Sequence, residues 1–74
     1  MVELKRVSGK TVIRPLERLG FVQTRQQGSH VVLKKMPEAV VGCVVPLHRE
    51  LAVGTLRAIQ KQGGVSLQDF LDNL

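Results

Sequence analysis

The chain contains two histidines, His30 and His48, and one cysteine, Cys43. His30 follows Gly28 and Ser29 directly. An imidazole at this position could act as a general base, because it gains and loses a proton near neutral pH. Gly28 has no Cβ and would let a phosphate or a sugar approach the backbone closely. The alternative interpretation is a surface histidine beside an ordinary hairpin glycine.

Basic side chains lie close to His30 in the sequence. Arg25, Lys34 and Lys35 could neutralise phosphates beside it. Lys and Arg number 11 against 6 Asp and Glu, a net charge of +5, which favours a polyanionic partner such as nucleic acid. The paired lysines could instead be a solvated strand edge. Phe21 and Phe70 are the only Phe, Tyr or Trp residues, so we do not expect a platform of stacking rings for RNA bases.

His48 and Cys43 are weaker candidates for a catalytic role than His30. His48, in a loop after Pro46, could orient a substrate or assist a proton transfer, or it could cap the loop by hydrogen bonding. Cys43 is flanked by valine and glycine inside an apolar run, which favours a buried small side chain over a nucleophile. His30, His48 and Cys43 lack the paired spacing of a structural zinc site, and we expect neither a metal nor another cofactor.

The length and the apolar pattern limit the class of protein. A chain of 74 residues allows one domain, which we place at residues 1–74. One cysteine cannot form an intramolecular disulfide, which excludes the disulfide-stapled secreted mini-proteins. No apolar run approaches the roughly 20 residues of a membrane helix, and the N-terminus lacks the apolar stretch of a secretory signal. We therefore expect a cytoplasmic protein that does not contact membranes.

An amphipathic helix is predicted to precede the residues around His30. Val12, Ile13, Leu16 and Leu19 share one face of this helix, and Gly20 is its expected stop. Ser8 or Thr11 could be the N-cap. Pro15 lacks a backbone donor, so the helix should either begin late, near Thr11, or bend close to Pro15.

Three antiparallel strands are predicted next, at residues 21–27, 29–36 and 40–45. The turn at Gly28 and Ser29 joins the first two, Pro37 and Glu38 mark the second turn, and Pro46 ends the third strand. In the second strand Val31 and Leu33 should face the helices, which places His30 and Lys34 on the open face. A register slip of one residue would invert this assignment.

Two helices are predicted after the loop at residues 46–53. Thr55 could cap the first, which would bury Leu56 and Ile59 and stop at Gly63 and Gly64. Ser66 and Asp69 resemble a capping box for the second. The residues that this last helix should bury are Leu67, Phe70, Leu71 and Leu74. The predicted fold is α+β, in the order α-β-β-β-α with a three-stranded antiparallel sheet and a short extra C-terminal helix.

Several short segments together resemble the HicA family of mRNA interferase toxins, from about Ser8 to the end of the chain. The matching segments are Gly20-Phe21, Arg25, Gly28-Ser29-His30, Val45-Pro46-Leu47-His48, Gly54-Thr55-Leu56-Arg57-Ala58-Ile59 and Ser66-Leu67-Gln68-Asp69-Phe70-Leu71. Each segment alone is weak evidence, but their order and spacing make the resemblance fairly specific.

The resemblance implies a double-stranded-RNA-binding-domain-like fold and a ribosome-independent, metal-independent endoribonuclease. His30 would be its catalytic residue, which takes the proton of a ribose 2′-hydroxyl or gives one to the leaving oxygen. Gly28, Ser29, Arg25, Lys34 and Lys35 would then be the RNA-binding residues. The implied partners are mRNA and a HicB antitoxin that covers the active face, and we expect the toxin alone to be a monomer.

Two features depart from the family pattern. Val31 stands where many members carry a second histidine, which leaves His30 without an adjacent acid–base partner, and Pro15 is unusual inside the first helix. Two other functions remain open. The chain could be a non-catalytic small basic RNA-binding domain, or an inactivated toxin that still binds its antitoxin.

Overall fold

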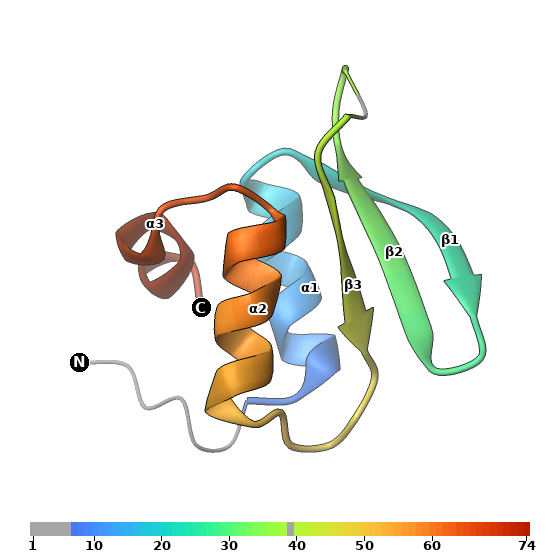
Figure 1. Cartoon of the computed structure of the whole chain (residues 1–74), viewed down its shortest axis with the longest axis vertical. Helices are drawn as coiled ribbons and strands as arrows, with labels where there is room; N and C mark the ends of the chain where they lie inside the picture. Colours follow the sequence, from blue (N-terminus) through green and yellow to red (C-terminus); the bar gives the residue numbers. More distant parts are fainter. Residues whose placement is uncertain (1–6, 39) are drawn as a thin grey trace.

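The computed structural model describes residues 7–38 and 40–74. The elements follow in the order α1 (Gly9–Arg18), β1 (Phe21–Gln27), β2 (His30–Lys35), β3 (Gly42–Pro46), α2 (Val53–Gln62) and α3 (Leu67–Asp72). Figure 1 shows α1 and α2 side by side on one face of the sheet, with α3 on the side of α2 away from the strands. The predicted α+β fold with its extra C-terminal helix is therefore confirmed. No helix of the described residues is long and apolar enough to cross a lipid bilayer.

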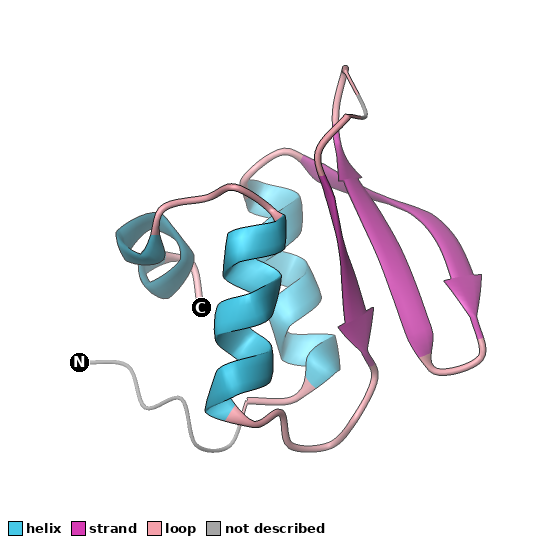
Figure 2. Cartoon of the chain, in the orientation of Figure 1, coloured by secondary structure: helices cyan, strands magenta, loops and turns pink. Residues whose placement is uncertain are grey.

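The sheet is an antiparallel meander in the order β1-β2-β3, with β2 in the centre. Figure 2 shows the three strands with the helices all on one side of them. β3 begins at Gly42, two residues later than the sequence predicts, and includes Pro46. Pro46 is tolerated as the last residue of an edge strand, because such a position need not donate to the sheet.

The helix α1 begins after Ser8, the earlier of the two N-caps that the sequence offered. Ser8 is the N-cap, and its hydroxyl accepts a hydrogen bond of 3.1 Å from the amide of Thr11. Val7 and Val12, both buried, occupy the two positions of a hydrophobic staple around this cap. Because the cap and the staple fix the start at Gly9, Pro15 lies inside the helix, and the prediction of a start near Thr11 is wrong.

The helix α2 also begins earlier, and the prediction that Thr55 caps it is wrong. Its N-cap is Ala52, which has no capping side chain. Leu51 and Leu56 lie at the staple positions and are 3% and 1% exposed, so apolar burial fixes this start in place of a polar cap. The helix ends where predicted, at Gly63, and Gly64 follows with a φ of +66°.

The cap of α3 is confirmed, because the hydroxyl of Ser66 accepts a hydrogen bond of 3.0 Å from the amide of Asp69. The burial predicted for this helix is only partly correct. Phe70 is buried, whereas Leu67 is 40% exposed and Leu74 packs at the margin of the core. Phe70 enters the core, whereas Leu67, the first residue of this six-residue helix, stays largely outside it.

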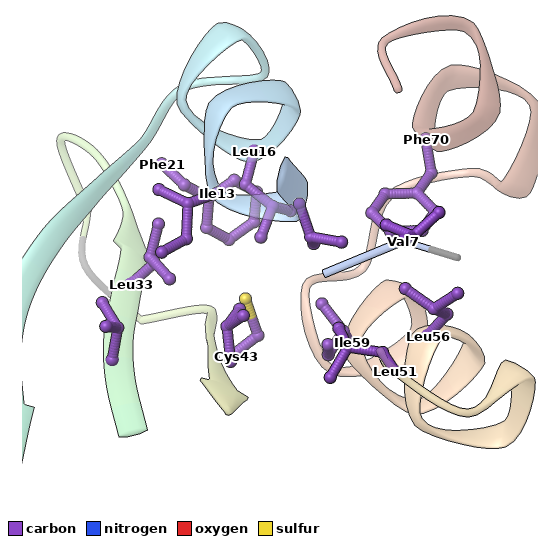
Figure 3. Close-up of a cluster of buried hydrophobic side chains, with 13 residues drawn as sticks. Val7, Ile13, Leu16, Phe21, Leu33, Cys43, Leu51, Leu56, Ile59 and Phe70 are labelled. Carbon is purple, nitrogen blue, oxygen red and sulfur yellow. The ribbon is translucent and has the colours of Figure 1, made fainter. Parts of the chain in front are cut away.

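The core lies between the sheet and the helices. Figure 3 shows Leu33 and Cys43 from the strands facing Ile13 and Leu16 of α1, while Phe70 enters from α3. Among the described residues no polar or charged side chain is buried. Any chemistry of the polar residues described here therefore takes place at the surface.

Candidate active site

His30 is the first residue of β2 and lies on the open face of the sheet. Val31 and Leu33 are 1% and 0% exposed on the helix side, while His30 and Lys34 are exposed. This confirms the predicted assignment of the two faces. His30 pairs with Gln27 of β1 on one side and with Pro46 of β3 on the other. Residues that pair across strands share a face, so both neighbours also border the open face.

A bulge in β1 brings Arg25 to the same face as His30. Before the bulge Gln23 pairs with Leu33, on the helix side; after it Arg25 pairs with Val32, on the open side. Strict alternation from the buried Phe21 would have placed Arg25 on the helix side. The extra residue of the bulge reverses the alternation for the rest of the strand.

Arg25 joins a polar group around His30. Its Nη2 donates a hydrogen bond of 3.3 Å to Oε1 of Gln27, which is the direct partner of His30 across the strands. Lys34 lies on the same face, two pleats along β2 from His30. The structure therefore brings Arg25 to the face of His30, whereas Lys34 shares that face about 13 Å farther along the strand, at roughly 3.3 Å per residue.

Lys35 lies on the other face of the sheet. It pairs with Phe21, and its Nζ lies 5.5 Å from the centroid of the Phe21 ring, a cation–π contact. At roughly 3.3 Å per residue, Lys35 is about 17 Å along the strand from His30. Lys35 is thus near neither His30 nor the polar group around it.

Gly28 and Ser29 form the hairpin turn before His30, as predicted. Gly28 has a φ of +59°, and a Cβ built on it would meet no atom within 4 Å. The glycine is therefore required by its left-handed backbone and not by crowding within the chain. The space beside Gly28 is open to a ligand.

The loop after β3 brings His48 next to His30. The two ring centroids are 6.3 Å apart, and the rings are nearly perpendicular, at 78°. The residues just before the two histidines are hydrogen-bonded to each other, with the amide of Leu47 donating to the carbonyl of Ser29 at 2.6 Å. His30 therefore has a second histidine beside it in space, although the next residue in the sequence is Val31.

Sequence reasoning missed this proximity, although a signal for it was present. A turn at Pro37 and Glu38 folds the third strand back on the second, which pairs His30 with Pro46. His48 follows Pro46 by two residues. The predicted turn therefore already implied that the two histidines lie at the same end of the sheet.

The backbone of the His48 loop is held on both sides. The amide of Gly9 donates to the carbonyl of His48 at 3.0 Å, and the amide of Leu51 donates to the carbonyl of Val7 at 2.8 Å. Leu51 is also buried. Because these contacts involve the backbone, the exposed His48 side chain is left available for other contacts.

A basic cavity lies beside His48. It has a volume of about 430 Å³ and is lined by Ser8, Lys10, Leu47, His48 and Arg49. Lys10 and Arg49 are exposed and positively charged. A polyanion lying across the two histidines would therefore also meet positive charge beyond His48.

Cys43 is buried in β3, as predicted. Burial raises the pKa of its thiol to about 11, because desolvation disfavours the thiolate. The thiolate is the nucleophilic form, so Cys43 is inert near neutral pH. In the part of the chain that the structure describes, the His, Cys, Asp and Glu side chains form no group of three or more that could hold a metal ion.

The exposed histidine pair can exchange protons with a ligand on the open face, and Arg25 and Lys34 can contact its negative charges.

The family model described as the HicA toxin of bacterial toxin–antitoxin systems matches residues 9–65. A comparison with curated proteins gave no match. The matched region spans α1, the sheet and α2, and so includes both histidines and the basic residues around them. The chain therefore belongs to the HicA toxin family, the toxins of bacterial toxin–antitoxin systems.

Proposed function

We propose that this chain is a ribosome-independent endoribonuclease that cleaves mRNA without a metal, with His30 as an acid–base group. The exposed imidazole of His30 on the open, basic face of the sheet carries this proposal. His30 would take the proton of a ribose 2′-hydroxyl or give a proton to the leaving oxygen. The activated 2′-oxygen attacks the adjacent phosphate, a reaction available to RNA and not to DNA.

The surroundings of His30 suit a phosphodiester substrate. Arg25 and Lys34 lie on its face of the sheet and would contact phosphates, and Gly28 and Ser29 form a turn with open space beside it. Lys35 would add positive charge at the far end of β2. General acid–base catalysis by one group contributes about 10²–10⁴-fold, so we expect slow cleavage.

The antitoxin partner follows from the family. HicA toxins pair with HicB antitoxins, and we propose that HicB covers the open face. Val22 and Val44 are 47% and 41% exposed on this face and would supply apolar contact area beside the charged residues. In the absence of HicB we expect a monomer.

Controlled expression of the wild type and of His30→Ala in bacterial cells tests this function. Growth and transcript integrity are followed together, and purified proteins are assayed on RNA with a metal chelator. We expect the wild type alone to arrest growth and cut RNA. Gln23→Ala is the matched control, because Gln23 is an exposed strand residue on the other face of the sheet.

The outcomes separate the possible functions. Cleavage by a folded His30→Ala protein would show that His30 has a different role. Salt-sensitive RNA binding by the wild type without cleavage, unchanged in His30→Ala, would identify a non-catalytic RNA-binding domain. Negligible RNA affinity with retained binding of the antitoxin would identify an inactivated toxin.

A further inference from the structure

We infer that His48 is a second catalytic residue, which forms an acid–base pair with His30. This inference rests on the proposed function and adds the group that performs the second proton transfer. Its basis is the 6.3 Å between the two ring centroids, together with the exposure of both side chains.

The separation of the rings suits a phosphodiester that contacts both of them. A ring nitrogen acts on an oxygen at about 2.7–3.2 Å, so both imidazoles must be able to reach the same phosphodiester group. Two exposed rings whose centroids are 6.3 Å apart can both reach oxygens of one phosphodiester laid across them.

Cleavage of RNA needs two proton transfers at one phosphate. The 2′-oxygen forms a bond to the phosphorus, and its proton passes to the neutral imidazole of one histidine. The bond between the phosphorus and the 5′-oxygen breaks, and the protonated imidazole of the other histidine gives its proton to that oxygen. The products are a 2′,3′-cyclic phosphate and a 5′-hydroxyl, and the reaction exchanges the protonation states of the two histidines.

Backbone contacts fix the positions of the two histidines relative to each other. Pro46 pairs with His30 across β2 and β3, and the amide of Leu47 donates to the carbonyl of Ser29 at 2.6 Å. The carbonyl of His48 accepts from the amide of Gly9 at 3.0 Å. Positioned acid–base groups act only within hydrogen-bond reach of the reacting oxygens, and these three contacts fix the backbone that sets this reach.

The charges around the pair support a path for the RNA strand. Arg25 lies on the open face near His30, and Lys34 lies farther along the same face. Lys10 and Arg49 line the cavity of about 430 Å³ beside His48. A strand that runs from the open face toward this cavity passes both histidines. Its phosphates would meet positive side chains on both sides of the scissile bond.

The test compares His48→Ala with the wild type on a short RNA of defined sequence, over a range of pH. We expect the rate to fall by about 10²–10⁴-fold and the bell-shaped pH dependence to lose one arm, because one of two titrating groups is removed. Glu50→Ala is the matched control, since Glu50 is an exposed residue of the same loop. It should keep the wild-type rate and pH profile.

A substrate with sulfur in place of the 5′-oxygen assigns the two roles. A thiolate leaves without being protonated, so removal of the general acid should cost little on this substrate, whereas removal of the general base should cost as much as before. If only His48→Ala recovers, His48 is the general acid. If only His30→Ala recovers, His30 is the general acid and His48 is the general base. Either result supports the pair.

Three results would overturn the inference. One is a folded His48→Ala protein that cuts at the wild-type rate with the wild-type pH profile; another is a loss of RNA affinity that fully accounts for its lower rate. The third is the absence of recovery in both variants on the sulfur substrate. Failure of the wild type to cut RNA at all would instead refute the proposed function.

Discussion

The amide of Gly9, at the start of α1, donates a hydrogen bond of 3.0 Å to the carbonyl of His48. A Cβ on Gly9 would collide with the carbonyl oxygen of Pro46 and would lie 3.0 Å from Cα of Leu47. The first helix therefore contacts the His48 loop backbone to backbone, at a distance that only glycine permits. This contact couples the stability of α1 to the position of His48.

The first prediction concerns this contact. Gly9→Ala should lower the free energy of unfolding by about 1–3 kcal/mol, because an added methyl forces the backbone of the loop to move. Cleavage should fall by more than the loss of folded protein explains, because His48 shifts. Urea denaturation and single-turnover cleavage measure the two effects.

Gly54→Ala is the control for that variant. Gly54 also lies in the first turn of a helix, but a Cβ there would meet no atom within 4 Å. This change should be neutral or raise stability by about 0.5–1 kcal/mol. If Gly9→Ala were equally harmless, the contact between Gly9 and the loop would not constrain the site.

The second prediction separates the backbone of Gly28 from the space beside it. Its φ of +59° should make Gly28→Ala cost about 1–2 kcal/mol of stability, and Gly28→Asn less, because asparagine tolerates the left-handed conformation. The added asparagine side chain should still weaken RNA binding by occupying the open space beside the turn. Thermal unfolding and RNA titration measure the two effects.

Gly64 provides the matched control for Gly28→Asn. It has a similar φ of +66° and follows α2. Gly64→Asn should have a comparable effect on stability and leave RNA binding unchanged. Equal losses of RNA affinity in the two variants would mean that the surface at Gly28 has no special part in binding.

The third prediction concerns the phosphate contacts. A single-stranded nucleic acid releases about 0.7 counterions per neutralised phosphate, so Lys34→Gln should reduce the slope of log K against log salt by about 0.7. Titrations in the His30→Ala background prevent cleavage during the measurement. Arg25→Gln should behave in the same way, since Arg25 shares the open face.

Two other lysines calibrate this measurement. Lys61→Gln, in the last turn of α2 and thus in the helix layer, should leave the slope unchanged. Lys35→Gln tests the RNA contact expected of Lys35 against its observed place over the Phe21 ring. An unchanged slope for Lys34→Gln would show that Lys34 does not contact the RNA phosphates.

The fourth prediction is a pH dependence of stability from Cys43. The thiol has a pKa of about 11 in the folded chain against an ordinary value of 9.0. Between these values the folded chain keeps a proton that the unfolded chain has lost, so stability is full below about pH 9 and decreases as the pH rises toward 11. The decrease should amount to about 2–3 kcal/mol.

Cys43→Val isolates this effect from the titration of lysines. Urea denaturation of both proteins at pH 8, 9.5 and 11 should show a difference that changes with pH only because of the thiol. Parallel pH profiles for the two proteins would contradict a strongly desolvated thiol.

The fold class and the two faces of β2 could be predicted from local sequence patterns. Alternating burial of Val31 and Leu33, the turn at Gly28 and the cap at Ser66 follow from local rules that tertiary contacts did not override. The start of α2 did not follow, because the burial of Leu51 against the core fixes it and the polar Thr55 does not.

The set of side chains around His30 depends on contacts between distant parts of the chain. The bulge in β1 places Arg25 on the open face, where simple alternation would have put it on the helix side. Pairing of β2 with β3 and the close approach of Gly9 bring His48 to within 6.3 Å of His30 between ring centroids. Register and backbone approach depend on residues far apart in the chain, so local sequence patterns carry little of this information.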